Sequence, residues 1–239
     1  MTEPTIETLI NQYADRLHDL PELREREGVF HDRQHAGRTL AEMLSDADPE
    51  NPLVLAVPAG GVPVAVVMAD QLGWPLDVAV VSKITLPHNT EVGCGAIAFD
   101  GTFELNEPLI DRAGLGEVAL QRRITETRRK VQRRFDELRP ARGPMDLTGK
   151  NIVLVDDGLA SGFTMMVAVR AARSFNPAGV AVAVPTSPAR SASLLLEYAD
   201  ELWCPNLRSS PRFAVAAAYC NWRDVSEDEA LATLQAGRS

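Results

Sequence analysis

The sequence has 239 residues, of which 45% are apolar and 24% are charged, with a formal net charge of −9. These values are typical of a globular protein with one α/β domain or two small ones, and the acidic balance argues against a dedicated nucleic-acid or anionic-membrane binder. The apolar runs are too short to span a bilayer. Three widely spaced cysteines and an acidic N-terminus without an apolar core favour a cytoplasmic setting.

Residues 1 to 27 are rich in Glu, Asp and Arg and carry only a weak helical stripe, so we expect an acidic N-terminal arm before one domain over residues 28–239. Asp32 is placed to cap the next helix, whose buried stripe is Ala36, Leu40, Met43 and Leu44. His31 and His35 have the i, i+4 spacing of a metal pair. Solvated histidines are the favoured interpretation, because no acidic third ligand follows.

Leu53 to Val57 is a predicted buried strand, and the turn Pro58 to Pro63 leads into a helix that reaches Leu72. A Gly-rich turn between a strand and a helix can hold an anion with its backbone N–H groups. An ordinary tight turn is the alternative. The next predicted strand is Leu76 to Ser82, and Lys83 at its end is either a functional cation or a solvated side chain.

Residues 84 to 95 lack periodicity and are predicted to form a mobile loop. Two apolar segments then flank Asp100-Gly101, which is a strong signal for a β-hairpin. A loop followed by an antiparallel ribbon is suited to cover a reactive intermediate that must be kept from water. His88 and Glu91 are the polar residues of this predicted lid.

Residues 107 to 142 are predicted to be helical, and their second half is strongly basic. A solvated helix face is the default interpretation. A face that attracts polyphosphate, or that packs on the acidic arm of a second copy in a homodimer, is the alternative.

The strongest pattern of the sequence begins at the predicted central strand, Ile152 to Val155, and continues into Asp156 and Asp157. The following residues, 158 to 164, form a small-residue loop that opens a helix. Free N–H groups and the positive helix end make such a loop a socket for phosphate, and ionised carboxylates beside it can accept hydrogen bonds from sugar hydroxyls. The alternative is an ordinary turn whose acids cap a helix or pair with arginine.

After that helix we expect a buried strand over residues 179–184, a helix over 188–198, a short strand over 200–204 and an irregular stretch to residue 222. Ser226 and Glu229 have the spacing of a capping box, which predicts a terminal helix over 227–236. The predicted fold class is α/β, with a doubly wound, mainly parallel sheet, a lid hairpin and a small C-terminal cap.

The stretch from Asn151 to Thr164 resembles the signature for phosphoribosyl pyrophosphate (PRPP) in the type I phosphoribosyltransferases. The resemblance implies that Asp156, Asp157 and Lys83 are catalytic, with the two acids on the ribose 2- and 3-hydroxyls. It implies a site for the 5-phosphate at Ala160, Ser161, Gly162, Phe163 and Thr164, where Phe163 replaces a glycine of many members. It implies a site for pyrophosphate at Ala59, Gly60 and Gly61, in a loop that often contains a cis peptide without proline.

Longer stretches, among them FHDRQHAGRTLAEML, LAVPAGGVPVA and VVSKITLPHNTEVGCGAIAFDG, are similar to a group of predicted phosphoribosyltransferases whose acceptor is unassigned. The resemblance covers residues 29 to about 230. That group usually has arginine where this chain has Ala59 and Ser82. Both differences remove positive charge from the expected pyrophosphate end.

The activity implied is the Mg²⁺-dependent transfer of 5-phosphoribosyl from PRPP to an unidentified acceptor, for which a nucleobase is a candidate, with release of pyrophosphate. The metal would be carried by PRPP without direct protein ligands. The alternative is a non-catalytic module that senses PRPP or a nucleotide, which the missing charges favour and the lid segment opposes. A phosphohydrolase is a third interpretation, but no nucleophile motif supports it.

In this family the acceptor pocket is a hood formed by chain outside the sheet. The candidates are the region of Arg33 and the aromatic stretch that contains Tyr219 and Trp222. An aromatic ring could stack on a planar acceptor. The alternative is that these rings anchor the C-terminal segment to the core.

Overall fold

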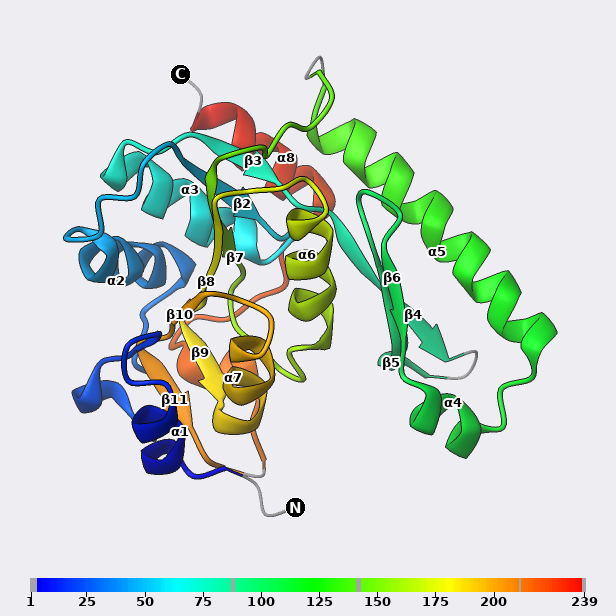
Figure 1. The fold of residues 1–239 in the computed structure, drawn as a ribbon, viewed down its shortest axis with the longest axis horizontal. Helices are drawn as coiled ribbons and strands as arrows, with labels where there is room; N and C mark the ends of the chain where they lie inside the picture. The colour runs from blue at the N-terminus through cyan, green and yellow to red at the C-terminus, as the bar shows by residue number, and fades with distance from the viewer. Residues whose placement is uncertain (1–3, 87–88, 141–142, 211, 238–239) are drawn as a thin grey trace.

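A computed structural model describes residues 4–86, 89–140, 143–210 and 212–237. Its centre is a six-stranded sheet in the order β1-β10-β8-β7-β2-β3, in which every neighbouring pair is parallel (Figure 1). The strands are β1 (Leu17–His18), β2 (Pro52–Ala56), β3 (Leu76–Val78), β7 (Asn151–Val155), β8 (Gly179–Ala183) and β10 (Glu201–Trp203). The predicted α/β class with a mainly parallel sheet is confirmed.

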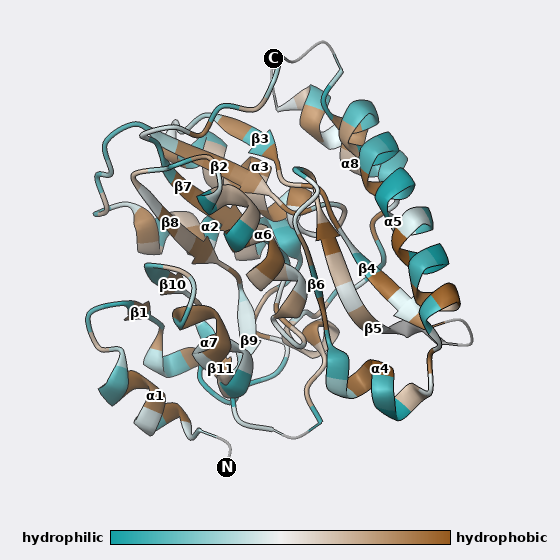
Figure 2. Cartoon of the chain, turned by 45° about the vertical axis from the view of Figure 1, so that its right-hand side comes forward, coloured by the Kyte–Doolittle hydropathy of each residue, from teal (hydrophilic) through white to brown (hydrophobic). Residues whose placement is uncertain are grey.

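Helices cover both faces of this sheet because its inner strands are apolar on both sides, as the brown strands of Figure 2 show. Leu55, Leu154 and Val182 face one core, and Val54 and Val153 face the other. The first core is covered by α1 (Ile6–Gln12), α6 (Phe163–Arg173) and α7 (Ala189–Leu196), and the second by α2 (Arg33–Leu44), α3 (Gly61–Leu72) and α8 (Glu227–Ala236).

A second, antiparallel sheet has the order β4-β5-β6 and lies between α6 and a long outer helix (Figure 1). Its elements are β4 (Val81–Leu86), β5 (Asn89–Ala98), β6 (Phe103–Leu105), α4 (Glu107–Ala113) and the long helix α5 (Glu117–Leu138). Phe99 links the outer helix α5 to the end of α6. Its ring centroid lies 6.0 Å from that of Phe135 in α5 and 5.9 Å from that of Phe175 just after α6. The predicted hairpin at Asp100-Gly101 is confirmed, with φ of +90° at Gly101.

Three predicted elements in this region are wrong. The expected strand from Leu76 to Ser82 is two strands in different sheets, β3 and β4. The expected loop over residues 84–95 is largely β4 and β5, because cross-strand pairing orders a stretch that shows no period of its own. The expected single helix over residues 107–142 is α4 and α5, separated at Gly114, whose φ of +61° ends α4.

The N-terminal segment is packed on the main sheet. β1 adds an outer strand in which Leu17 pairs with Leu202, and Ile6 and Leu9 are buried in the core beside α7. The guanidinium of Arg16 donates hydrogen bonds to the backbone carbonyls of residues 196, 199 and 200. The weak stripe of the sequence is therefore a buried face, while a domain boundary after residue 27 stays a prediction.

The C-terminal third contains shorter elements. A parallel pair is formed by β9 (Thr186–Pro188) and β11 (Asn206–Arg208), and single 3₁₀ turns lie at Pro21–Leu23 and Val215–Ala218. The predicted terminal helix is confirmed as α8, and its capping box joins Ser226 to Glu229 in both directions. None of the helices in the described ranges combines the length and apolar character needed to cross a bilayer.

Candidate active site

The candidate site lies where β2 and β7 end side by side. The backbone of Val57, just after β2, donates a hydrogen bond to the carbonyl of Val155, the last residue of β7, at 2.8 Å. A cavity of about 590 Å³ opens beyond these ends. Its walls come from the turn after β2, the loop after β7, the edge strand β4, the inner face of α5 and the segment around Trp222. Ligands of doubly wound sheets bind at this edge.

The acid pair stands at the floor of this cavity. The backbone N–H of Asp157 donates to Asp156 Oδ1 at 2.8 Å, which holds the two side chains in a fixed relation. Burial raises the pKa of the Asp156 carboxyl well above its usual range, and the neighbouring charge of Asp157 raises it further. Burial also raises the pKa of Asp157, while Arg33 acts in the opposite direction. The pair therefore offers desolvated oxygens to a ligand that can supply hydroxyl donors.

Asp157 is held by the N-terminal part of the chain. Arg33 Nε donates to Asp157 Oδ2 at 2.8 Å, and Nη2 lies 2.7 Å from the same oxygen. The Tyr219 hydroxyl donates to the Asp157 carbonyl at 2.7 Å. The Arg33 guanidinium also lies over the Trp222 ring, 4.0 Å from its centroid. Among the described side chains, no cation pairs with Asp156, so Asp156 is the freer carboxylate.

The loop after the acid pair has the geometry of a phosphate cradle. Gly162 has φ of +74° and leads into α6, whose first N–H groups point toward the cavity end of the helix. The loop is held from behind, because Ser191 Oγ donates to the Ala160 carbonyl at 2.7 Å. Phe163 packs against the core, so its ring does not crowd the loop. Ser161 Oγ accepts from the Phe163 N–H at 3.3 Å.

The glycine turn after β2 packs directly on the acid pair. The Pro58–Ala59 peptide bond is cis, as the family resemblance implies. A Cβ atom on Gly60 would lie 2.1 Å from Asp157 Oδ2, and one on Gly61 would lie 2.5 Å from the Val155 carbonyl oxygen. Glycine is needed at both positions because the backbone approaches this closely. The structure therefore brings together the residues predicted for the acid pair and for both anion loops.

Of the residues expected near the lid, the structure describes the side chain of Lys83 but not those of His88 and Glu91. Lys83 lies within β4 rather than at the end of a strand of the main sheet, and its exposed side chain lines the cavity. His88 lies outside the described residues. Glu91 belongs to β5, but its side chain is not among those described. Both lid assignments stay predictions.

The two candidate hood segments lie against each other. The backbone N–H groups of Gly28 and Phe30 donate to the carbonyls of Ala217 and Ala218, at 2.8 and 2.9 Å. This pairing brings the start of α2 to the aromatic stretch. Trp222 is half-buried, packs on Tyr219 at 5.1 Å between centroids and also lines the cavity. The geometry is compatible with a ring that anchors the segment and with a ring that meets an acceptor.

The histidine pair at the start of α2, His31 before the helix and His35 within it, has structural partners. His35 Nδ1 accepts from the His31 backbone N–H at 3.0 Å, and the His31 ring lies within hydrogen-bond distance of Asp32 and Asn221. Hydrogen bonding to the His35 backbone, above all, lowers the pKa of Asp32, which caps α2 as predicted. In the parts of the chain that the structure describes, no three His, Cys, Asp or Glu side chains are grouped to hold a metal ion.

The sequence analysis noted the basic helix but did not single out its two cations that line the cavity, Lys130 and Arg134. The buried side of α5 follows the spacing Leu120, Ile124, Thr127, Val131, Arg134, Leu138, and Arg134 is only 7% exposed. Its Nη1 donates to Ser82 Oγ at 3.1 Å, and its Nε lies 2.8 Å from Glu227 Oε1. The available signal for Arg134 was an arginine in a mostly apolar helix stripe, because a buried cation requires partners.

Comparisons with known proteins agree with this geometry. The family described as phosphoribosyl transferase domain matches residues 30–219. Proteins from two strains of Mycobacterium tuberculosis, provisionally named phosphoribosyl transferases, are 38% identical over 208 residues, which is 86% of this chain and 46% of each relative. This chain thus spans about half the length of the curated relatives it matches.

A solved structure from Thermus thermophilus shares this fold. The crystal structure of a Thermus thermophilus protein has a TM-score of 0.69 and 33% identity, and the match covers 86% of this chain and 97% of that one. A purine phosphoribosyltransferase from Pyrococcus horikoshii has a TM-score of 0.43 and 17% identity over 78% of this chain and 96% of that one. The matched family region contains both anion loops and the acid pair. The chain therefore belongs to the phosphoribosyl transferase domain family.

Proposed function

We propose that this chain transfers the 5-phosphoribosyl group from PRPP to an acceptor and releases pyrophosphate. The observation that carries the proposal is the convergence of three features on one cavity of about 590 Å³. They are a phosphate loop at the start of α6, the acid pair, and the turn after β2, which lines the cavity with Val57 and Pro58 and packs Gly60 on Asp157.

Each part of the site has a task in this proposal. The N–H groups of residues 160–164 bind the 5-phosphate, and the hydroxyls of Ser161 and Thr164 add donors. Asp156 and Asp157 accept hydrogen bonds from the ribose hydroxyls, with Arg33 fixing the orientation of Asp157. The backbone of Gly60 and Gly61 meets the pyrophosphate. Lys83 lies on the wall that faces the leaving group.

The reaction needs no protein nucleophile. A lone pair of the acceptor forms the bond to C1 with inversion, and the C1–O bond to pyrophosphate breaks, with its electron pair leaving on the pyrophosphate oxygen. The proton that the acceptor loses passes to solvent. Positive charge develops on the sugar ring, so the chain contributes by positioning the two reactants, stabilising the leaving group and excluding water.

Mg²⁺ is proposed as a partner of the substrate. The ion usually keeps several waters and binds substrate phosphates with one or two carboxylates. In this proposal the phosphates of PRPP carry the hydrated ion without a direct protein ligand, and the carboxyl groups of Asp156 and Asp157 at the cavity floor suit a neighbouring hydrated cation. When bound, the ion neutralises charge on the departing pyrophosphate.

A planar heterocycle such as a nucleobase is the proposed acceptor class. Trp222 supports it, because the ring lines the cavity while Arg33 covers one of its faces. Trp222→Ala should keep the affinity for PRPP and reduce turnover with the correct acceptor. Loss of PRPP affinity together with a large loss of stability would show that the ring only anchors the C-terminal segment.

A non-catalytic module that senses PRPP or a nucleotide is the second candidate. It is supported by Ala59 and Ser82, which bring no charge to the pyrophosphate end. A sensor would bind PRPP through the same loops and would not cleave it.

The two candidates are separated by incubating the protein with PRPP, Mg²⁺ and a panel of nucleobases while pyrophosphate release and calorimetric binding are measured. Release that depends on an acceptor supports transfer. Binding of PRPP without release with any acceptor supports the sensor. Absence of PRPP binding contradicts both. The double variant Asp156→Asn, Asp157→Asn is the inactive control.

We also propose a cytoplasmic location and a homodimer. Cys94, Cys204 and Cys220 are unpaired, which is typical of a reducing compartment. The basic face of α5 and the acidic segment around α1 lie on opposite sides of the protomer in Figure 1, so contact between them requires a second copy. Sedimentation at low and high salt tests this, since a dimer held by such charges dissociates as salt is added.

A further inference from the structure

The cavity carries its cationic side chains on one wall. A pyrophosphate group is a concentrated anion, yet Ala59 and Ser82 are uncharged and the nearby acid pair supplies no positive charge. The cationic side chains among the described lining residues are Lys83, Lys130 and Arg134. Lys83 lies on β4, and the other two lie on α5. The phosphate loop is on a different wall of the cavity, in the connection from β7 to α6.

Arg134 reaches the cavity past the edge of the antiparallel sheet. β4 is the outer strand of that sheet, and the Nη1 group of Arg134 donates to Ser82 Oγ at 3.1 Å and lies 3.4 Å from the Val81 carbonyl oxygen. The small side chain at position 82 leaves space for the guanidinium. Among the described residues, the hydrogen bonds that the Arg134 guanidinium donates come from Nη1. The Nη2 donors therefore stay available to a ligand in the cavity that Arg134 lines.

Glu227 holds this arginine from the other side. Its Oε1 lies 2.8 Å from Arg134 Nε, at the first residue of α8. Burial, chiefly, lowers the pKa of Arg134, and the charge of Glu227 acts in the opposite direction. A buried arginine with one carboxylate partner and an accessible cavity beside it is placed to accept a second anion.

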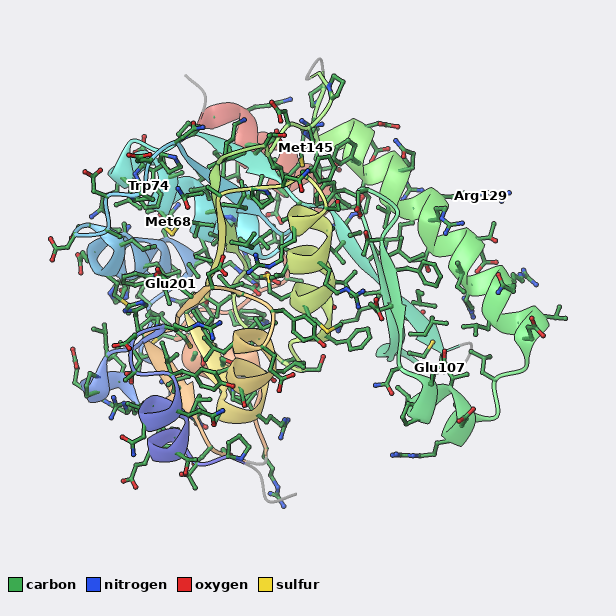
Figure 3. All side chains as sticks on the ribbon, viewed as in Figure 1. Met68, Trp74, Glu107, Arg129, Met145 and Glu201 are labelled. Carbon is green, nitrogen blue, oxygen red and sulfur yellow. The ribbon has the colours of Figure 1, made fainter. Side chains whose placement is uncertain are left out.

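Lys130 precedes Arg134 by one helical turn. The i, i+4 spacing puts both side chains on the same face of α5, and both line the cavity. Other basic residues of this helix are directed elsewhere. Arg133 is exposed and 3.7 Å from Glu137, and Arg129 points away from β4 (Figure 3).

We propose that Lys130 and Arg134 bind the pyrophosphate end of PRPP and supply from α5 the positive charge that positions 59 and 82 lack. This inference rests on the proposed function, because it concerns the leaving group of that reaction. Arg134 offers a planar fork to phosphate oxygens, and Lys130 offers a mobile point charge. Both stabilise the negative charge that collects on pyrophosphate as the C1–O bond breaks.

The test compares two ligands that differ only by the pyrophosphate. Affinities for PRPP and for ribose 5-phosphate, both in the presence of Mg²⁺, are measured by calorimetry on the wild type, Lys130→Met, Arg134→Met and the control Arg129→Met. A charge-assisted contact changes affinity by roughly tenfold to a hundredfold. We expect losses of about that size for PRPP in the Lys130 and Arg134 variants, changes within about twofold for ribose 5-phosphate, and no change for Arg129→Met.

Three results would overturn the inference. One is a PRPP affinity in Lys130→Met equal to that of Arg129→Met; Lys130 is exposed, so this variant does not depend on core packing. Another is an equal loss of affinity for PRPP and ribose 5-phosphate, which would place the effect outside the pyrophosphate end. The third concerns the wild type and is given last.

For Arg134, the variant Arg134→Lys separates the loss of charge from a loss of folding, and its PRPP affinity should lie between those of wild type and Arg134→Met. A wild type that binds no PRPP overturns the proposed function and this inference together.

Discussion

At the scale of single residues, the site is built around two adjacent carboxyl groups, of which one is paired with a cation. Arg33 pairs with Asp157, whereas Asp156 has no such partner among the described residues, and burial raises its pKa well above the usual range. Buried groups of this kind lower stability unless a ligand satisfies them. Their presence is therefore evidence for binding, because an apolar residue would serve the fold better.

Asp156→Asn should stabilise the free protein and weaken PRPP binding. The pKa of Asp156 is raised in the folded state above its ordinary value of 3.8, so the folded wild type binds more protons and loses stability as pH rises from that value through the raised pKa. Asparagine does not titrate, and the advantage of the variant should grow with pH across this window. Urea unfolding from about pH 4 to about pH 8 measures it.

The same variant should lose roughly 1.5–3 kcal/mol of PRPP binding, as expected for a hydrogen bond to a charged group. Asp111→Asn, on the exposed side of α4, is the matched control and should change neither quantity. A stability difference that is independent of pH would contradict the assignment of a strongly raised pKa to Asp156.

Arg33→Ala should cost about 3–5 kcal/mol of unfolding free energy, because it leaves the carboxylate of Asp157 buried without its partner. Arg33 is 8% exposed and also covers the Trp222 ring. The control is Arg38→Ala on the same helix, which is exposed and should stay within about 0.5 kcal/mol of wild type. Equal unfolding free energies of Arg33→Ala and Arg38→Ala in urea would show that the Arg33–Asp157 ion pair is screened by solvent and contributes little to stability.

At the scale of elements, two strand-to-helix connections pack on each other, and the glycine turn of one determines the position of the acid pair of the other. Gly60→Ala tests this contact. The new Cβ would lie 2.1 Å from Asp157 Oδ2, so the carboxylate must move. Overpacking of this kind costs about 1–3 kcal/mol.

We expect Gly60→Ala to reduce PRPP affinity by at least roughly tenfold, because the displaced carboxylate no longer faces the sugar. Gly143→Ala is the control, since a Cβ there meets no atom within 4 Å. Calorimetry and urea unfolding measure the two effects. Wild-type affinity in Gly60→Ala would mean that the turn tolerates a side chain and that the contact does not position Asp157.

At the scale of the whole molecule, segments from the N-terminal and C-terminal parts of the chain pack together beside the site. The N-terminal segment provides β1 at one edge of the sheet and Arg33 beside the cavity, and the C-terminal segment pairs with residues 28–31. Residues far apart in sequence thus surround one ligand site. A change in the N-terminal segment should therefore affect the stability of the entire domain.

Leu9→Ala measures how firmly this segment is integrated. Leu9 is fully buried in the core that α7 also covers, and truncating a leucine in such a place costs about 2–5 kcal/mol. Gln12→Ala, exposed on the same helix, is the control and should have little effect. A single unfolding transition, shifted by Leu9→Ala, is expected in urea. An unchanged midpoint would mean that residues before 27 form an independent arm.

The sequence by itself determined the elements whose signals are local. The strand β7, its acid pair and the loop into α6 are contiguous, and so are the turn after β2 and the capping box of α8. Each can be predicted because strand burial, helix capping and glycine geometry act over a few neighbouring residues. The α/β class followed from the alternation of these local signals.

Tertiary structure decided the rest, because a local pattern shows that a side chain will be buried but not what it will meet. Arg33 and Asp157 are 124 residues apart, and Arg134 and Ser82 are 52 residues apart. β5 acquires its order from pairing with β4 and β6. The two-residue strand β1 exists only because β10 offers an edge. Ion pairs and sheet edges depend on distances that arise after the chain has folded.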